Sequence, residues 1–138
     1  MCLLLEKARK DYDTAIYMQK VNDELYLGIC CFHIQQAIEK VLKCSIELKG
    51  FRYPYEHSIS KLYGVYINAG WPEYKDLRMM AGTLTDWESS AGYKDSFAAT
   101  ISQLADALEI YKELEKRLVI YLTENNGKSS NPKPLQFR

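Results

Sequence analysis

The 138-residue chain has the usual length of one globular domain and is too short for two. Hydrophobic residues make up 47% and charged residues 26% of the sequence, which excludes the composition of a disordered chain. The 18 basic residues balance the 18 acidic ones, so no strong net field attracts nucleic acid or an anionic membrane without specificity.

The N-terminus and the cysteines indicate the cell compartment. Only three apolar residues, Leu3 to Leu5, precede the first charges, too few for a signal peptide or a membrane span. Cys30 and Cys31 are adjacent and point in different directions on a predicted helix, and no cysteine has metal-ligand spacing. We therefore expect a cytoplasmic protein without membrane contact, disulfide framework, metal or cofactor, whose Cys30, Cys31 and Cys44 are small buried hydrophobes.

Apolar residues at steps of three and four predict two helices in the first half of the chain. The first covers about 2–20. The second runs from Glu24 to about Lys49 without a proline, which is about 39 Å at 1.5 Å per residue. Its apolar arc is wider than one seam needs, so it belongs at the centre of a bundle; the inward stripe is Leu27, Cys31, Ile34, Ile38, Val41, Ser45 and Leu48.

Three further helices are predicted. Gly50 ends the second helix, and Pro54 keeps the following loop non-helical until Ser58 starts a short third helix over 58–68. A fourth helix is expected over about 73–89 and a fifth over about 95–123.

The predicted fold class is all-α: an antiparallel up-and-down four-helix bundle with an additional short connecting helix. The folded domain would span residues 1–123. Residues 124–138 are polar and contain two prolines, so we expect a flexible tail there.

Three segments resemble the HEPN domain family. Residues 30–43, CCFHIQQAIEKVLK, are similar to the FHxQQAxEKxLK stretch on the family's second helix. Residues 50–62 resemble its histidine-containing loop and next helix, and residues 87–95 resemble the turn before its last helix. The resemblance covers about residues 5–122.

The resemblance implies a homodimeric helical bundle of prokaryotic defence and toxin–antitoxin systems, often found beside a small nucleotidyltransferase. Some members are metal-independent endoribonucleases with an Arg-polar-xxx-His motif. Others lack the motif and bind nucleotides or partner proteins. The fold therefore leaves the function open.

Arg52 and His57 match the nuclease spacing by count. A histidine would move the proton of the 2′-hydroxyl or leaving oxygen, and an arginine would stabilise the charge of the phosphorane. Family nucleases, however, carry the motif near the start of the last main helix, where this chain has Gly92 and no later histidine. This departure favours a non-catalytic member.

A polar stripe on the second helix is the main candidate binding site. His33, Gln36 and Lys40 lie at i, i+3 and i+7, either to line a pocket or to satisfy hydrogen bonds between packed helices. Glu39 and Lys43 are interpreted as a solvated i, i+4 ion pair. The predicted ligand-binding residues are His33, Gln36, Lys40, His57, Tyr93 and Lys94.

Two weaker patterns lie elsewhere. Aromatic residues around Arg52 either stack bases or close the end of the bundle; they are Phe51, Tyr53, Tyr55, Tyr63 and Tyr66. Asp86, Glu88 and Asp95 carry carboxylates of the type that holds magnesium, but we interpret them as helix caps or solvated groups.

The leading hypothesis is a non-catalytic HEPN module, a homodimer that binds a nucleotide, RNA or a partner such as a nucleotidyltransferase. The first alternative is an endoribonuclease toxin using Arg52 and His57. The second is a purely structural interaction bundle.

Overall fold

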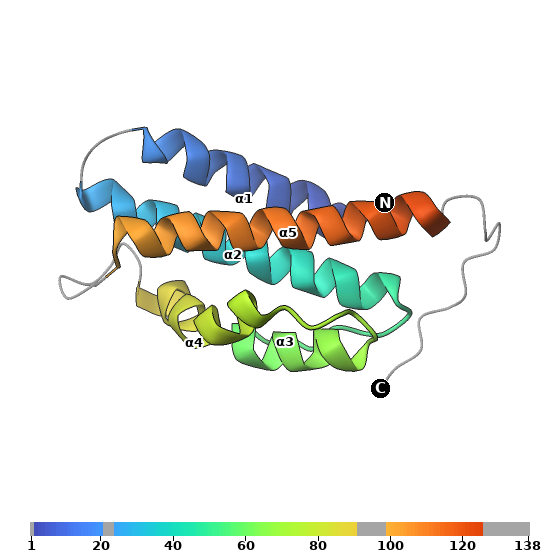
Figure 1. The fold of residues 1–138 in the computed structure, drawn as a ribbon. Helices are drawn as coiled ribbons and strands as arrows, with labels where there is room; N and C mark the ends of the chain where they lie inside the picture. Colours follow the sequence, from blue (N-terminus) through green and yellow to red (C-terminus); the bar gives the residue numbers. More distant parts are fainter. Residues whose placement is uncertain (1, 21–23, 91–98, 126–138) are drawn as a thin grey trace.

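The computed structural model describes residues 2–20, 24–90 and 99–125. These residues form five α-helices, which confirms the all-helical prediction for this part of the chain (Figure 1). The helices are α1 Leu3–Gln19, α2 Glu24–Leu48, α3 Ile59–Asn68, α4 Lys75–Ser90 and α5 Ile101–Asn125.

Helix α2 lies at the centre, as its apolar arc predicts, and packs against all four other helices. In Figure 1, α1 lies along one side of α2, and α3 and α4 lie along the other. The predicted stripe is buried through its middle and partly buried at its two ends, Leu27 and Leu48. Removal of this apolar surface from water is the main force that holds the other helices to α2.

The end of α2 follows the predicted glycine signal. Gly50 has φ +88°, and it donates to the Glu47 carbonyl at 3.0 Å while Phe51 donates to the Ile46 carbonyl at 3.3 Å. This pair of bonds is a Schellman motif, and Gly70 forms the same motif after α3. At the start of α3, the Ser58 hydroxyl accepts the Lys61 N–H at 3.3 Å, as an N-cap does.

The fifth helix starts later than predicted. Ala99 and Thr100 are not helical, and α5 begins at Ile101 because a capping box fixes its start. The Thr100 hydroxyl accepts the Gln103 N–H at 3.0 Å, and the Gln103 side chain accepts the Thr100 N–H at 3.0 Å. Ile101, the first residue of α5, is 70% exposed, and residues 95–98 lie outside the described part of the chain.

Two other boundaries also differ. Helix α4 begins at Lys75, not at residue 73, and the Tyr63 hydroxyl accepts the backbone N–H of Tyr74 at 2.9 Å, a group that has no acceptor within the helix. Helix α5 extends to Asn125, so the first two residues of the predicted tail, 124 and 125, are helical. The rest of that tail lies outside the described residues.

Arg117 on α5 holds the connection between α3 and α4. Its guanidinium donates to the carbonyl of Pro72 at 2.7 Å and to that of Glu73 at 3.1 Å. It also binds Glu113 at 2.9 Å and lies over the Tyr74 ring, 4.9 Å from the centroid. The planar, five-donor fork of arginine serves all these partners at once, which a lysine cannot do.

We predict that Arg117→Lys lowers the free energy of unfolding by about 1–2 kcal/mol, because at least one carbonyl and the ring contact lose their partner. Urea denaturation of the full chain measures the change. Lys116→Arg, at the exposed neighbouring position, is the control and should change stability by less than about 0.5 kcal/mol. Equal stability of Arg117→Lys and wild type would contradict this role.

Candidate functional site

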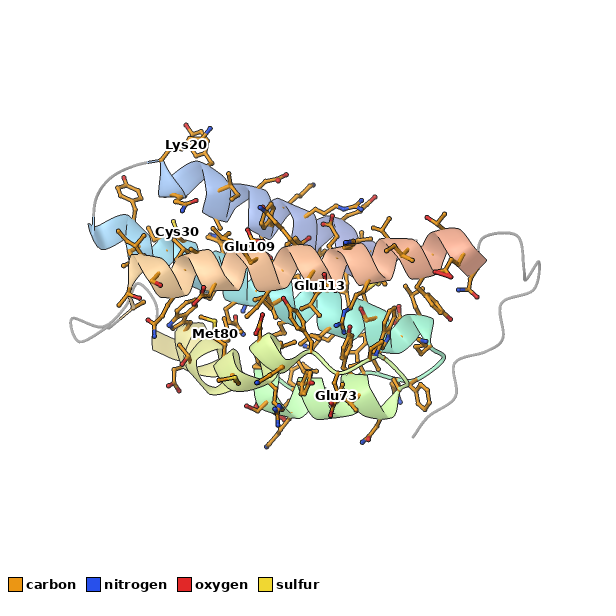
Figure 2. All side chains as sticks on the ribbon, viewed as in Figure 1. Lys20, Cys30, Glu73, Met80, Glu109 and Glu113 are labelled. Carbon is orange, nitrogen blue, oxygen red and sulfur yellow. The ribbon has the colours of Figure 1, made fainter. Side chains whose placement is uncertain are left out.

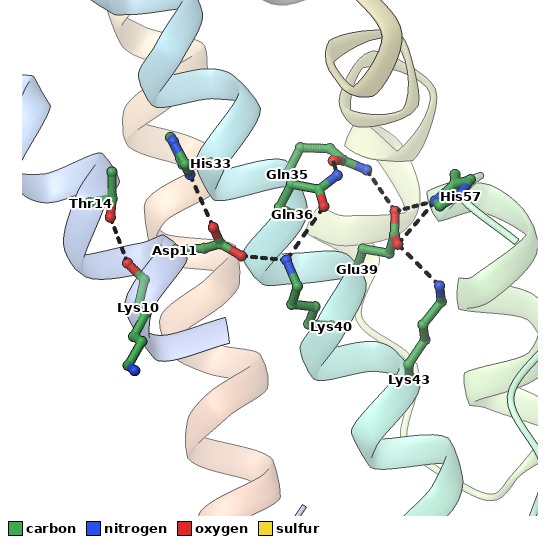
Figure 3. Close-up of polar contacts among 10 residues, drawn as sticks. All are labelled: Lys10, Asp11, Thr14, His33, Gln35, Gln36, Glu39, Lys40, Lys43 and His57. Carbon is green, nitrogen blue, oxygen red and sulfur yellow. Dashed lines mark hydrogen bonds and ion pairs between the residues drawn. The ribbon is translucent and has the colours of Figure 1, made fainter. Parts of the chain in front are cut away.

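Three predicted ligand residues come together where α2 faces α1 (Figure 3). Nδ1 of His33 lies 3.0 Å from Oδ1 of Asp11, and Nζ of Lys40 donates to Oδ2 of the same carboxylate. The Asp11 side chain is only 17% exposed. A single carboxylate of α1 therefore binds both basic side chains of the predicted stripe.

Two amide side chains continue the polar contacts across α2. Lys40 donates to Oε1 of Gln36 at 3.4 Å, and Nε2 of Gln36 donates to Oε1 of Gln35 at 2.8 Å. Nε2 of Gln35 then donates to Oε1 of Glu39 at 3.4 Å. These residues join the α1 side of α2 to the side that faces the loop before α3 (Figure 3).

Glu39 forms three further contacts on the side of α2 that faces the loop before α3. Its Oε2 accepts from Nζ of Lys43 at 3.1 Å, and Nδ1 of His57 lies 3.2 and 3.3 Å from its two oxygens. The ammonium of Lys43 also lies 5.6 Å from the centroid of the Tyr53 ring. We call the set Asp11, His33, Gln35, Gln36, Glu39, Lys40, Lys43 and His57 the α2 network.

The prediction of a solvated Glu39–Lys43 pair is wrong. The two side chains are 6% and 10% exposed, so the pair is buried. The i, i+4 spacing predicts that the pair forms but not which side of the helix carries it. In this chain α2 is covered on nearly every side, and no solvated face remains in its middle for these charges.

The other candidates lie outside α2. His57 faces Glu39, and its side chain is 51% exposed, so the ring has one edge on the carboxylate and part of its surface in solvent. Arg52 lies in the same loop with an exposed side chain. Tyr93 and Lys94, with Gly92 beside them, lie outside the described residues.

Two members of the network were missed by the sequence interpretation. Gln35 precedes Glu39 by four residues, and Glu39 precedes Lys43 by four, so a second polar stripe was readable beside the first. Asp11 had no local signal, because it is one of several charges on an amphipathic helix. Only the packing of α1 on α2 selects it.

The described part of the chain leaves no buried side-chain nitrogen or oxygen without a hydrogen-bond partner. Within the same residues, no group of three His, Cys, Asp or Glu side chains is placed to hold a metal ion. None of the described helices is both long and apolar enough to span a membrane.

The cysteines and aromatic residues are mostly structural. Cys30, Cys31 and Cys44 are buried as predicted, and burial raises the pKa of Cys31 to about 12. Half-buried Cys2 differs, since a hydrogen bond from Cys44 lowers its pKa to about 7. The predicted aromatic cluster divides: Tyr63 and Tyr66 are buried, while Phe51 and Tyr53 are half-buried and Tyr55 is exposed.

A family model described as HEPN domain matches residues 1–121. The chain belongs to the HEPN domain family. The match covers all five helices except the last residues of α5. A search of curated proteins and a search of solved structures each found no match.

The burial of the Glu39–Lys43 pair predicts an asymmetric response to mutation. Glu39→Gln leaves the buried Lys43 ammonium without its counter-charge and should lower the free energy of unfolding by about 2–4 kcal/mol. Replacing both residues with methionine should recover most of this loss, because no unpaired charge then remains. Urea denaturation measures both effects.

The exposed pair Glu109–Lys112 provides the matched control. Glu109→Gln should change stability by less than about 0.5 kcal/mol, as expected for a solvated ion pair. A Glu39→Gln effect as small as this control would mean that Glu39 and Lys43 are solvated after all.

Proposed function

We propose that this HEPN-domain chain is a non-catalytic module that binds a partner protein in a toxin–antitoxin or nucleotidyltransferase-associated system. One observation carries the proposal: Asp11 already occupies the position in which His33 and Lys40 would hold an anionic ligand. The carboxylate of Asp11 thus already serves as the counter-charge for the basic groups of the stripe.

A nucleotide or RNA phosphate at this stripe would have to displace Asp11 from both side chains. The carboxylate would then stay largely buried beside a second anion, which costs several kcal/mol. Gln36 and Gln35 are likewise bonded to neighbours on α2. The α2 network therefore supports a structural role for the stripe and, among the binding functions of the family, favours a protein partner over a nucleotide.

A metal-independent endoribonuclease is the second candidate, and the contact between Glu39 and His57 favours it. A carboxylate at Nδ1 orients an imidazole and leaves Nε2 as the proton acceptor of the neutral ring. Arg52, in the same exposed loop, is the candidate for stabilising phosphorane charge. The charge of Glu39 is shared with Lys43, however, and the site that the family uses for its motif has Gly92 in this chain.

The family relationship supports three further parts of the proposal. These are an antiparallel four-helix bundle with a short connecting helix, a homodimer, and a nucleotidyltransferase as the partner protein. Each of them stays a prediction.

We predict that the purified protein does not cleave structured or single-stranded RNA in the absence of metal. Arg52→Ala and His57→Ala should leave any trace of cleavage unchanged, because the family's nucleases carry their motif near the start of the last main helix, where this chain has Gly92. A gel assay comparing wild type with the two variants measures this.

Lys61→Ala, in the exposed first turn of α3, controls for the loss of a nearby positive charge. Robust cleavage that disappears in Arg52→Ala or His57→Ala, but persists in Lys61→Ala, would make the endoribonuclease the correct function.

A further inference from the structure

Helices α4 and α5 pack against each other far less closely than α1 and α2 do, and a groove of about 420 Å³ lies between them. Met80 and Ile110 form its apolar floor, and Met79 stands at its edge with 72% of its surface exposed. Figure 2 labels Met80 on α4 and Glu109 on α5, which face the groove from its two sides. A soluble domain normally covers such flexible apolar side chains, unless they form a binding surface.

The rim of the groove is acidic. Asp76, Asp106 and Glu109 line it with exposed carboxylates, and none of the described residues that line it is basic. Within the described part of the chain, Asp76 and Asp106 form no ion pair, and Glu109 pairs only with the exposed Lys112. The groove thus combines an apolar floor with a surplus of negative charge.

Tyr74, which also lines the groove, is affected by the same negative charges. Burial raises its pKa to about 12, and the carboxylates of Asp76, Glu113 and Glu109 add to the effect although Arg117 opposes it. Negative charges disfavour the phenolate, so this direction is the one expected beside an acidic rim. Arg117, bound to the Pro72 and Glu73 carbonyls, lies over the Tyr74 ring.

The charge and shape of the groove favour some classes of ligand over others. RNA phosphates would be repelled by the rim, and no three carboxylates are placed to hold a metal ion among the described residues. A second copy that presented the same groove would bring like charges together. The space between two antiparallel helices accepts the ridge of a third helix, as in other helix-in-groove complexes.

We propose that the groove between α4 and α5 docks an amphipathic helix of a partner protein, with apolar residues at i, i+3 or i+4, and i+7 against Met79, Met80 and Ile110, and with Lys or Arg beside Asp106 and Glu109. This inference rests on the proposed partner-binding function and names the surface and the class of partner. The residues that line the groove include no member of the α2 network.

The test uses a fluorescein-labelled peptide of leucine and lysine, about 18 residues or roughly five helical turns long, with leucine at the stated spacing. Fluorescence anisotropy with the full chain should show saturable binding that weakens as salt is added. A peptide with glutamate in place of every lysine should not bind. Amide shifts in nitrogen-15 spectra should change along α4 and α5, and not along α1.

Two double variants with the same change in net charge make the test specific. Asp106→Lys with Glu109→Lys should weaken the leucine–lysine peptide at least about tenfold. Glu6→Lys with Asp13→Lys, at exposed positions of α1 that do not line the groove, should change the affinity by less than about twofold, since charges outside the binding site act only through screened solvent. Circular dichroism melting establishes that each variant is folded.

Several results would overturn the proposal. They are absence of binding, equal weakening by both double variants, or shift changes confined to other helices. If the protein alone dimerises in light scattering and Asp106→Lys with Glu109→Lys abolishes the dimer, the groove belongs to a second copy instead. The result of the RNA cleavage assay does not depend on these outcomes. The docking proposal and the proposed non-catalytic function can therefore be disproved separately.

Discussion

The burial of α2 is the constraint on which the rest of the structure depends. A helix that packs against four others has little surface left for solvent, yet its sequence places Gln35, Glu39 and Lys43 in the buried middle. Buried charges are tolerated only when they are paired and hydrogen-bonded. Glu39 and Lys43 pair with each other within α2, and His57 in the loop before α3 adds a contact to Glu39. The partly buried Lys40 takes its partner, Asp11, from α1.

This constraint gives the network a second role in the fold. If only apolar contacts joined α1 to α2, sliding α1 along α2 would cost little free energy. With the Asp11–Lys40 pair present, a shift of one helical turn would separate the two side chains and leave both charges poorly paired. The same argument applies to the loop with His57, which Glu39 holds against α2. The polar residues that resemble a ligand site are thus well suited to select one arrangement of the helices. In the groove between α4 and α5, by contrast, apolar side chains are left uncovered and, among the described residues, acidic side chains of the rim are left without an internal partner of opposite charge.

Much of the fold was predictable from local signals. Periodicity located all five helices, and Gly50 and Ser58 marked helix ends because their roles depend on a few adjacent residues. The start of α5 was misplaced because the apolar repeat continues upstream of the Thr100–Gln103 capping box, which the sequence interpretation did not weigh. Ile101 shows the same limit, since periodicity assigns it to a face but its exposure depends on which neighbours reach the end of the helix.

The site was predictable only in part. His33, Gln36 and Lys40 share a stripe as expected, because spacing on one helix is a local property. Their partner Asp11 and the burial of Glu39 and Lys43 were not predictable, because both depend on contacts between segments that are distant in sequence. The acidic groove was also invisible to pattern reading, since Asp76 and Asp106 come from different helices and look like ordinary solvated charges.

We propose that the imidazoles of His33 and His57, which contact internal carboxylates, are not held ready for a ligand. Long-range proton–nitrogen NMR of the side chains tests it most directly, at alkaline pH where imidazoles are neutral. We expect the hydrogen of both rings on Nδ1, a change at His33 in Asp11→Asn and at His57 in Glu39→Gln, and no change when ATP is added. Hydrogens on Nε2 in the wild type, or movement of either ring's signals with ATP, would contradict the claim.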